Sequence, residues 1–201
     1  MNTAHYFSSQ LASWLKQKQP KTVADLVAVF YEKSFAVCLL ILMFFPALPL
    51  PTGGVTHVFE VVAMLLAFEM ILGRRTIWLP RRWQKLDISS IGEGKVVGSL
   101  LKKLHWLESH SKPRLRQVIK NRLFLRMTGV FLAIFSAAAF LAPPFSGLDT
   151  LPSLGVVLIA LSIIFEDMLL YILGLVVGVV GIGTVIVLGA ALFKSFRFFF
   201  W

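Results

Sequence analysis

Five long apolar segments dominate this chain of 201 residues. Hydrophobic residues make up 57% of it and charged residues only 15%, and the mean hydropathy of +0.80 is far above that of a water-soluble domain of similar size. The apolar runs approach the roughly 20 residues with which a helix crosses a bilayer. The sequence therefore predicts an all-α integral membrane protein and excludes a soluble globule. The five segments are 35–51, 55–72, 127–142, 151–165 and 168–193.

Most of these segments are slightly short for an upright crossing. A helix of sixteen to eighteen residues is roughly 24 to 27 Å long, whereas the hydrocarbon core is about 30 Å thick. We predict about four transmembrane helices, with at least one element that is broken by Pro or Gly or is re-entrant. Before them, residues 1–34 combine a polar segment with an amphipathic interfacial helix, and after them residues 194–201 form an aromatic anchor.

A basic connector, residues 74–126, separates the second and third apolar segments. It holds 14 Lys and Arg residues against three Asp and Glu residues, and basic loops beside membrane spans stay in the cytoplasm. Apolar residues at helical spacing between Val96 and Leu107 predict a helix on the inner leaflet, in contact with anionic lipids. A solvated loop that only fixes topology explains the charge equally well. In a membrane protein the net charge of +10 indicates lipid contact, and we predict no nucleic-acid partner.

The two membrane portions, residues 35–73 and 127–193, resemble each other. A shift of 97 positions places Pro46 on Pro143 and the pair Phe68-Glu69 on Phe165-Glu166. This pattern predicts two internal repeats joined by the basic connector. The sequence leaves open whether the two copies are parallel or inverted.

Proline and glycine interrupt both repeats, at 46–54 and again at 143–152. At a membrane surface these breaks are ordinary loops. At depth, a helix that starts there directs its free N–H groups at a polar or anionic substrate. The contacts would come from Thr52, Gly53, Gly54 and Thr56 in the first copy and from Ser146, Gly147, Thr150 and Ser153 in the second, with Arg74, Arg75, Arg81 and Arg82 binding a phosphate.

Four carboxylates in or beside the apolar segments are candidates for proton coupling: Glu60, Glu69, Glu166 and Asp167. Glu69 has a simpler interpretation as an interfacial carboxylate paired with arginine. Glu166 and Asp167 mark either a turn between two helices or a buried protonatable pair. His57 stands three residues before Glu60, so it either relays protons or has a structural role.

The remaining sequence features carry less information. Glycines between Gly174 and Gly183 predict a packing face or a homodimer face. Cys38 is the only cysteine, and the chain has no metal-ligand cluster, nucleotide-binding glycine loop or nucleophile elbow. We therefore predict no metal, no cofactor and no enzymatic activity.

Several short motifs resemble those of the ExoD-type exopolysaccharide-synthesis proteins. They are the proline-rich run at 45–51, Gly73-Arg74-Arg75, the Trp-Leu-Pro-Arg-Arg-Trp sequence at 78–83, and Phe165-Glu166-Asp167. The resemblance extends over most of residues 35–183. It implies a multi-pass protein of the bacterial inner membrane that is associated with exopolysaccharide production, and it implies no particular reaction.

Two functions fit these features. The first is a small transporter or flippase-like protein, in which broken helices form the site and the basic face attracts an anionic or lipid-linked substrate such as a polyprenyl phosphate. The second is a non-transporting assembly or regulatory protein, whose basic connector docks polysaccharide enzymes. A translocation assay separates them.

Overall fold

The computed structural model describes residues 7, 9, 12–13, 33–49, 56–74, 77, 102, 105–109, 111, 116–119, 121–143 and 146–200, with C-terminal side chains through Ala191. These residues contain helices and no strand, as predicted for an all-α protein. The helices are α3 (Ser34–Phe44), α4 (Thr56–Ile71), α7 (Arg116–Ile119), α8 (Arg122–Leu141), α9 (Thr150–Phe165) and α10 (Met168–Phe200).

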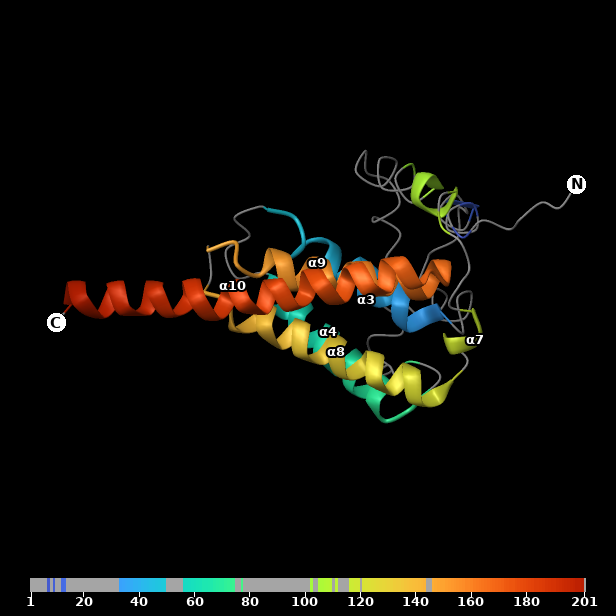
Figure 1. Ribbon diagram of the computed structural model, residues 1–201, viewed down its shortest axis with the longest axis horizontal. Helices are drawn as coiled ribbons and strands as arrows, with labels where there is room; N and C mark the ends of the chain where they lie inside the picture. The colour runs from blue at the N-terminus through green and yellow to red at the C-terminus, as the bar shows by residue number, and fades with distance from the viewer. Residues whose placement is uncertain are drawn as a thin grey trace, which may run out of the picture.

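The five longer helices run up and down along a common direction (Figure 1). Lys33, just before α3, contacts Glu166 at the end of α9. We call the end where Arg74 and Arg122 lie the connector end, and the end where Pro46 and Pro143 lie the proline end. Helices α3, α8 and α10 run from the connector end to the proline end, and α4 and α9 run back. Helix α10 continues well past the others (Figure 1).

Glycines allow these helices to approach one another closely. A Cβ atom on Gly129 of α8 would lie 2.9 Å from the carbonyl oxygen of Ala67 in α4. A Cβ atom on Gly155 of α9 would lie 2.6 Å from the Cα atom of Gly178 in α10. Both contacts are with backbone, so larger residues would force the helices apart. The glycine-rich face of α10 is therefore a packing face within the chain, apart from Gly183, which meets nothing within 4 Å.

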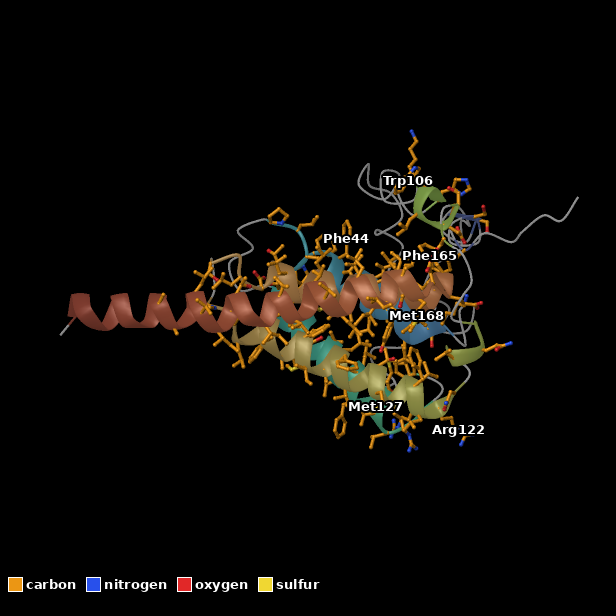
Figure 2. The ribbon with its side chains drawn as sticks, viewed as in Figure 1. Phe44, Trp106, Arg122, Met127, Phe165 and Met168 are labelled. Atoms are coloured by element: carbon orange, nitrogen blue, oxygen red, sulfur yellow. The ribbon has the colours of Figure 1, made fainter. Side chains whose placement is uncertain are left out.

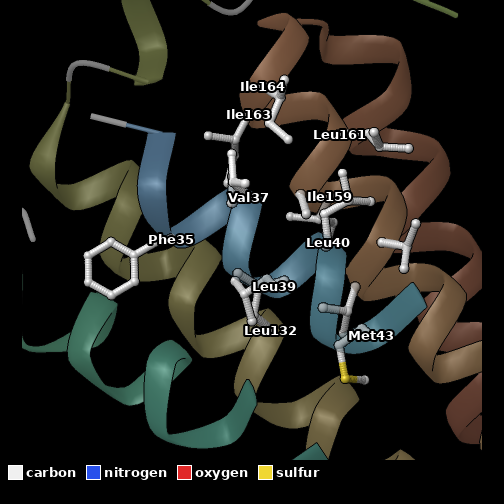
Figure 3. Close-up of a cluster of buried hydrophobic side chains, with 14 of the residues drawn as sticks. Phe35, Val37, Leu39, Leu40, Met43, Leu132, Ile159, Leu161, Ile163 and Ile164 are labelled. Atoms are coloured by element: carbon white, nitrogen blue, oxygen red, sulfur yellow. The ribbon is translucent and has the colours of Figure 1, made fainter. Parts of the chain in front are cut away.

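The apolar core lies where α3 packs against α9 and α4, and α8 contributes Leu132 to it (Figure 3). Val37, Leu39 and Met43 of α3 are fully buried, as are Leu132 of α8 and Ile159 of α9. Helix α3 packs mainly on α9, and α4 packs mainly on α8. The first helix of each membrane portion (α3 or α8) thus packs chiefly on the second helix of the other portion (α9 or α4).

The ends of the helices follow from local sequence. Helix α4 ends where the N–H of Arg74 bonds to the carbonyl of Glu69 at 3.1 Å, across Gly73 with φ of +76°. This is the Schellman arrangement, which favours glycine at that position. Helix α8 begins at Asn121, whose side chain accepts a bond from the N–H of Leu123 at 2.9 Å. Helix α3 ends two residues before Pro46, because proline cannot continue a helix.

The outer surface of the bundle is apolar. Large side chains of α4, α8 and the described part of α10 are exposed, including Leu65, Phe68, Ile134, Val179 and Val187. Met127 of α8 is one of them, and it projects outward from the bundle (Figure 2). Two helices are long and apolar enough to cross a membrane, Arg122–Leu141 and Met168–Ala191, and only 33% and 17% of these spans are buried. A core helix of a soluble protein would be mostly buried, so this pattern favours a lipid-facing surface.

Three of the five predicted segments differ from the helices. The first segment was predicted to end at 51, but α3 ends at Phe44, before the prolines. The third segment was predicted to begin at 127, but α8 begins at Arg122, because Arg122 and Arg126 occupy helical positions without being apolar. The last apolar segment was predicted to end at 193, before a separate anchor, but α10 continues to Phe200. Of the predicted helix at 96–107, the described residues include a helical turn at 105–109. The predicted amphipathic helix within residues 1–34 lies outside the described residues.

Candidate functional site

A buried carboxylate lies inside the bundle near the proline end. Glu60 of α4 is completely buried, and one of its oxygens is 2.6 Å from Nδ1 of His57. The His57 side chain is 26% exposed, so it stands between Glu60 and the surface. Its ring also packs edge-on against Phe140 of α8, with 5.4 Å between ring centroids. The predicted pairing of His57 with Glu60 on one helical face is confirmed.

A second carboxylate, Asp149, approaches this pair from the start of α9. It precedes Thr150, the first residue of α9, and its side chain accepts a hydrogen bond from the Thr56 hydroxyl at the start of α4. Burial raises the pKa of Asp149 above its usual value, although its hydrogen bonds and the nearby His57 oppose that change. Two helix starts and two carboxylates therefore meet at the proline end.

Two buried serines lie at the same level of the bundle. Helices α4 and α8 are antiparallel, and two contacts fix their register: His57 lies against Phe140, and Ala67 lies against Gly129. Glu60 comes three residues after His57, so it is at the level of residues about three before Phe140, close to Ser136. Gly155 of α9 packs against Gly178 of α10. Gly178 in turn lies against the ring of Phe135 in α8, so close that a Cβ atom added to this glycine would clash with the ring. Ser136 and Ser153 are therefore within about one helical turn of that level. The polar layer, as we call it, consists of Thr56, His57, Glu60, Ser136, Asp149 and Ser153.

Three atoms of the polar layer lack hydrogen-bond partners among the described residues. They are Oε1 of Glu60 and the hydroxyl oxygens of Ser136 and Ser153, and all three residues are fully buried. Buried polar atoms are nearly always hydrogen-bonded, and leaving one unpaired costs about 1–3 kcal/mol. Other buried hydroxyls, such as those of Thr128 and Ser162, have hydrogen bonds, so these three atoms at one level make the polar layer the candidate functional site.

The carboxylates at the connector end have partners. Glu69 is 3.6 Å from Arg74, as its simpler interpretation predicts. Glu166 and Asp167 form the turn between α9 and α10, which is one of the two predicted alternatives. Glu166 has a left-handed φ of 58° and pairs with Lys33 at 3.2 Å. Asp167 accepts bonds from the N–H of Leu169 at 2.9 Å and from the hydroxyl of Ser111 at 2.7 Å.

Lys33 connects α3 to α9 through two contacts, and its loss should be measurable. Its ammonium donates to the carbonyl of Ile164 at 2.7 Å and pairs with Glu166. The ion pair is partly exposed, so most of the effect should come from the bond to the carbonyl. We expect Lys33→Met to lower the free energy of unfolding by about 1 kcal/mol, measured by thermal unfolding in detergent. Lys102→Met, at an exposed position, is the control and should change nothing; equal stability of both variants would contradict this contact.

The predicted substrate-binding residues divide into two groups. Arg74 lies at the connector end, whereas Thr56 lies at the proline end, near the proton-coupling candidate Glu60. Helix α4 runs from Thr56 almost to Arg74, and its 16 residues make it about 24 Å long. Arg74 and the polar layer therefore cannot contact the same head group. The other predicted residues of this set, Thr52, Gly53, Gly54, Arg75, Arg81 and Arg82, lie outside the described residues.

The sequence did not indicate the whole polar layer. Thr56 and Ser153 were expected to supply hydroxyl contacts, and they are 97 positions apart, which is the spacing of the predicted repeat. Asp149 and Ser136 were missed. Asp149 could have been found as the charged residue of the second break, whereas Ser136 gives no signal within its apolar run. No three His, Cys, Asp or Glu side chains among the described residues are arranged to hold a metal ion.

Comparison with known proteins identifies the family. The family model described as "Exopolysaccharide synthesis, ExoD" matches residues 7–187. An uncharacterized protein of Synechocystis sp. (strain ATCC 27184 / PCC 6803 / Kazusa) is 30% identical over 156 residues, which cover 77% of this chain and 73% of that protein. No solved structure matches the chain. The motifs at the proline end and in the turn between α9 and α10 lie within the matched region, and the chain belongs to the ExoD family of exopolysaccharide synthesis.

Proposed function

We propose that this protein is a multi-pass protein of the bacterial inner membrane that moves an anionic or lipid-linked substrate of exopolysaccharide synthesis, such as a polyprenyl phosphate. The observation that carries the proposal is the polar layer. A bundle that only anchored other proteins would gain nothing from burying Glu60 with one oxygen that has no partner in the described part of the chain. Buried ionisable groups in membrane proteins usually belong to substrate or ion pathways.

The membrane arrangement is also part of the proposal. The alternating directions of α3, α4, α8, α9 and α10 support five passes, one more than the four predicted from the segment lengths. Helices α4 and α9 have 16 residues each and α3 has 11, so they are about 24 Å and about 16 Å long. They would require local thinning of the bilayer, most of all beside α3. The basic connector would stay in the cytoplasm, which places the proline end and the polar layer toward the outer side.

Two parallel repeats would explain the arrangement of the helices. Helices α3 and α8 start at the connector end, and α4 and α9 start at the proline end, as copies of one parallel unit would. A two-fold axis along the membrane normal would then relate Thr56 to Ser153, and both are buried in the polar layer. Parallel repeats with a site at their interface are a common design of small transporters.

The two groups of predicted binding residues would then serve two stages of transport. Arg74, with Arg75, Arg81 and Arg82, would attract the anionic head group at the cytoplasmic surface through charge-assisted hydrogen bonds. The polar layer would receive it at the other end of α4, and the predicted contacts from Thr52, Gly53 and Gly54, which precede α4 in the sequence, belong to this second stage of the proposal. The proposal requires no cofactor, metal or catalytic step, and a homodimer remains a prediction.

A translocation assay in liposomes tests this function. The full chain is reconstituted with a fluorescent polyprenyl phosphate, and the fraction that an impermeant quencher can reach is followed over time. We expect translocation to depend on the protein and to be faster than in liposomes with a heat-unfolded sample. If a folded sample moves none of several anionic lipids, and the protein instead co-purifies with polysaccharide enzymes through its connector, the assembly function is correct.

A further inference from the structure

We infer that Glu60 is a reversible proton-binding site that is loaded through His57 from the proline end. The coupling of this proton to transport rests on the proposed function, but proton binding itself rests only on the geometry of the polar layer. The inference names the ion and its route, which the membership of a polysaccharide-synthesis family does not.

The contacts of the Glu60 carboxyl fit a proton. One oxygen bonds to His57, and the other has no partner among the described residues. An ionised Glu60 would have only one bond to stabilise its charge in a fully buried position. A protonated, neutral carboxyl avoids the cost of an ionised group in this position. The hydroxyls of Ser136 and Ser153 are at the same level of the bundle but beyond hydrogen-bond distance of Oε1.

His57 provides the route between Glu60 and the surface. Its Nδ1 is 2.6 Å from Glu60, within the range for direct proton transfer. About a quarter of its side chain is exposed, and Phe140 packs against the ring without covering it. An imidazole can accept a proton on one nitrogen and release one from the other near neutral pH. Because His57 lies toward the proline end, the proton would enter from the outer side.

Few other charges act on Glu60. Asp149, at the start of α9, faces the same polar layer. Its negative charge disfavours a negative charge on Glu60. Helix α3 carries no charged residue, and the charged residues of α8 are Arg122 and Arg126, at the connector end. Glu69 is at the connector end of α4 itself, and α9 and the described side chains of α10 carry no charge. Among the described residues, the charged or titratable groups that act on the buried Glu60 are thus His57 and Asp149.

The composition of the layer favours a proton over a metal cation. No group of three His, Cys, Asp or Glu side chains among the described residues could hold a metal ion, and His57 already occupies one carboxylate oxygen. A proton needs no cavity and no further ligands. Sodium binding is nevertheless a distinct outcome of the experiment below.

Infrared difference spectroscopy tests this inference on the purified full chain in lipid vesicles. We expect a carbonyl band of a protonated carboxyl that disappears reversibly as the pH is raised. Glu60→Gln should lose this band, and Glu69→Gln, on the same helix but paired with Arg74, should keep it. His57→Gln should keep the band but slow its response to a pH jump by at least tenfold.

Two results would overturn the inference: an unchanged pH-dependent band in Glu60→Gln, or a band that sodium chloride removes at constant pH. The experiment does not depend on transport. A band assigned to Glu60 without lipid translocation would reject the proposed function alone, and translocation without the band would reject this inference alone. Circular dichroism of each variant confirms that the comparison is made between folded proteins.

Discussion

Gly155→Leu is expected to prevent the bundle from assembling. Even a Cβ atom at this position would lie 2.6 Å from the Cα atom and 2.9 Å from the nitrogen of Gly178. Because both contacts are with the backbone of α10, no side-chain rotation relieves them. Overpacking a core costs typically about 1–3 kcal/mol, and separating two helices along this face should cost at least that. Thermal unfolding in detergent and the yield of monodisperse protein measure the effect.

Gly183→Leu is the matched control for this variant. Gly183 lies on the same helix, but a Cβ atom there meets nothing within 4 Å. We expect this variant to unfold at the wild-type temperature. Similar stability of Gly155→Leu and Gly183→Leu would show that α9 and α10 do not pack as described.

Glu60→Gln should nearly abolish translocation without destabilising the protein. Glutamine keeps the shape of the side chain and can bond to His57, but it cannot exchange a proton. We expect the rate of polyprenyl-phosphate translocation to fall at least tenfold, which corresponds to about 1.4 kcal/mol. The unfolding temperature should stay the same or rise, because a buried ionisable group is replaced by a neutral one.

Glu108→Gln serves as the control for the loss of a carboxylate. Glu108 lies at the connector end, where it accepts a hydrogen bond from the backbone of Phe7, and it belongs to none of the proposed sites. Its translocation rate should equal that of the wild type. Wild-type translocation by a folded Glu60→Gln variant would remove Glu60 from the mechanism.

The positions of most helices along the chain were predictable from the sequence. In a membrane bundle both the lipid-facing and the core-facing positions are apolar, so each helix appears as a continuous apolar segment. The starts of α4 and α9 were predicted to within one residue, since the Pro and Gly breaks precede them. The start of α8 was missed because Arg122 and Arg126 interrupt the apolar pattern while keeping helical positions. The directions of the two helix pairs, which the sequence left open, follow from contacts such as Lys33 with Glu166.

The candidate site was predictable only in part. His57 and Glu60 are three residues apart on one helix, so local spacing was enough to pair them. No sequence pattern brings Asp149 to Glu60, because their proximity depends on how α9 packs against the other helices. Ser136 looks like any small residue of an apolar helix. Ser136 belongs to the candidate site because its hydroxyl is buried without a partner among the described residues. This burial results from the packing of the helices and cannot be read from the sequence.

Labelling of single cysteines in intact cells tests the proposed membrane arrangement. In a Cys38→Ala background, Ser146→Cys marks the proline end and Ser109→Cys marks the connector end. An impermeant thiol reagent should label Ser146→Cys from outside the inner membrane and should reach Ser109→Cys only after the membrane is opened. Labelling of both positions from the same side would contradict a bundle that spans the membrane with its polar layer opposite the basic connector.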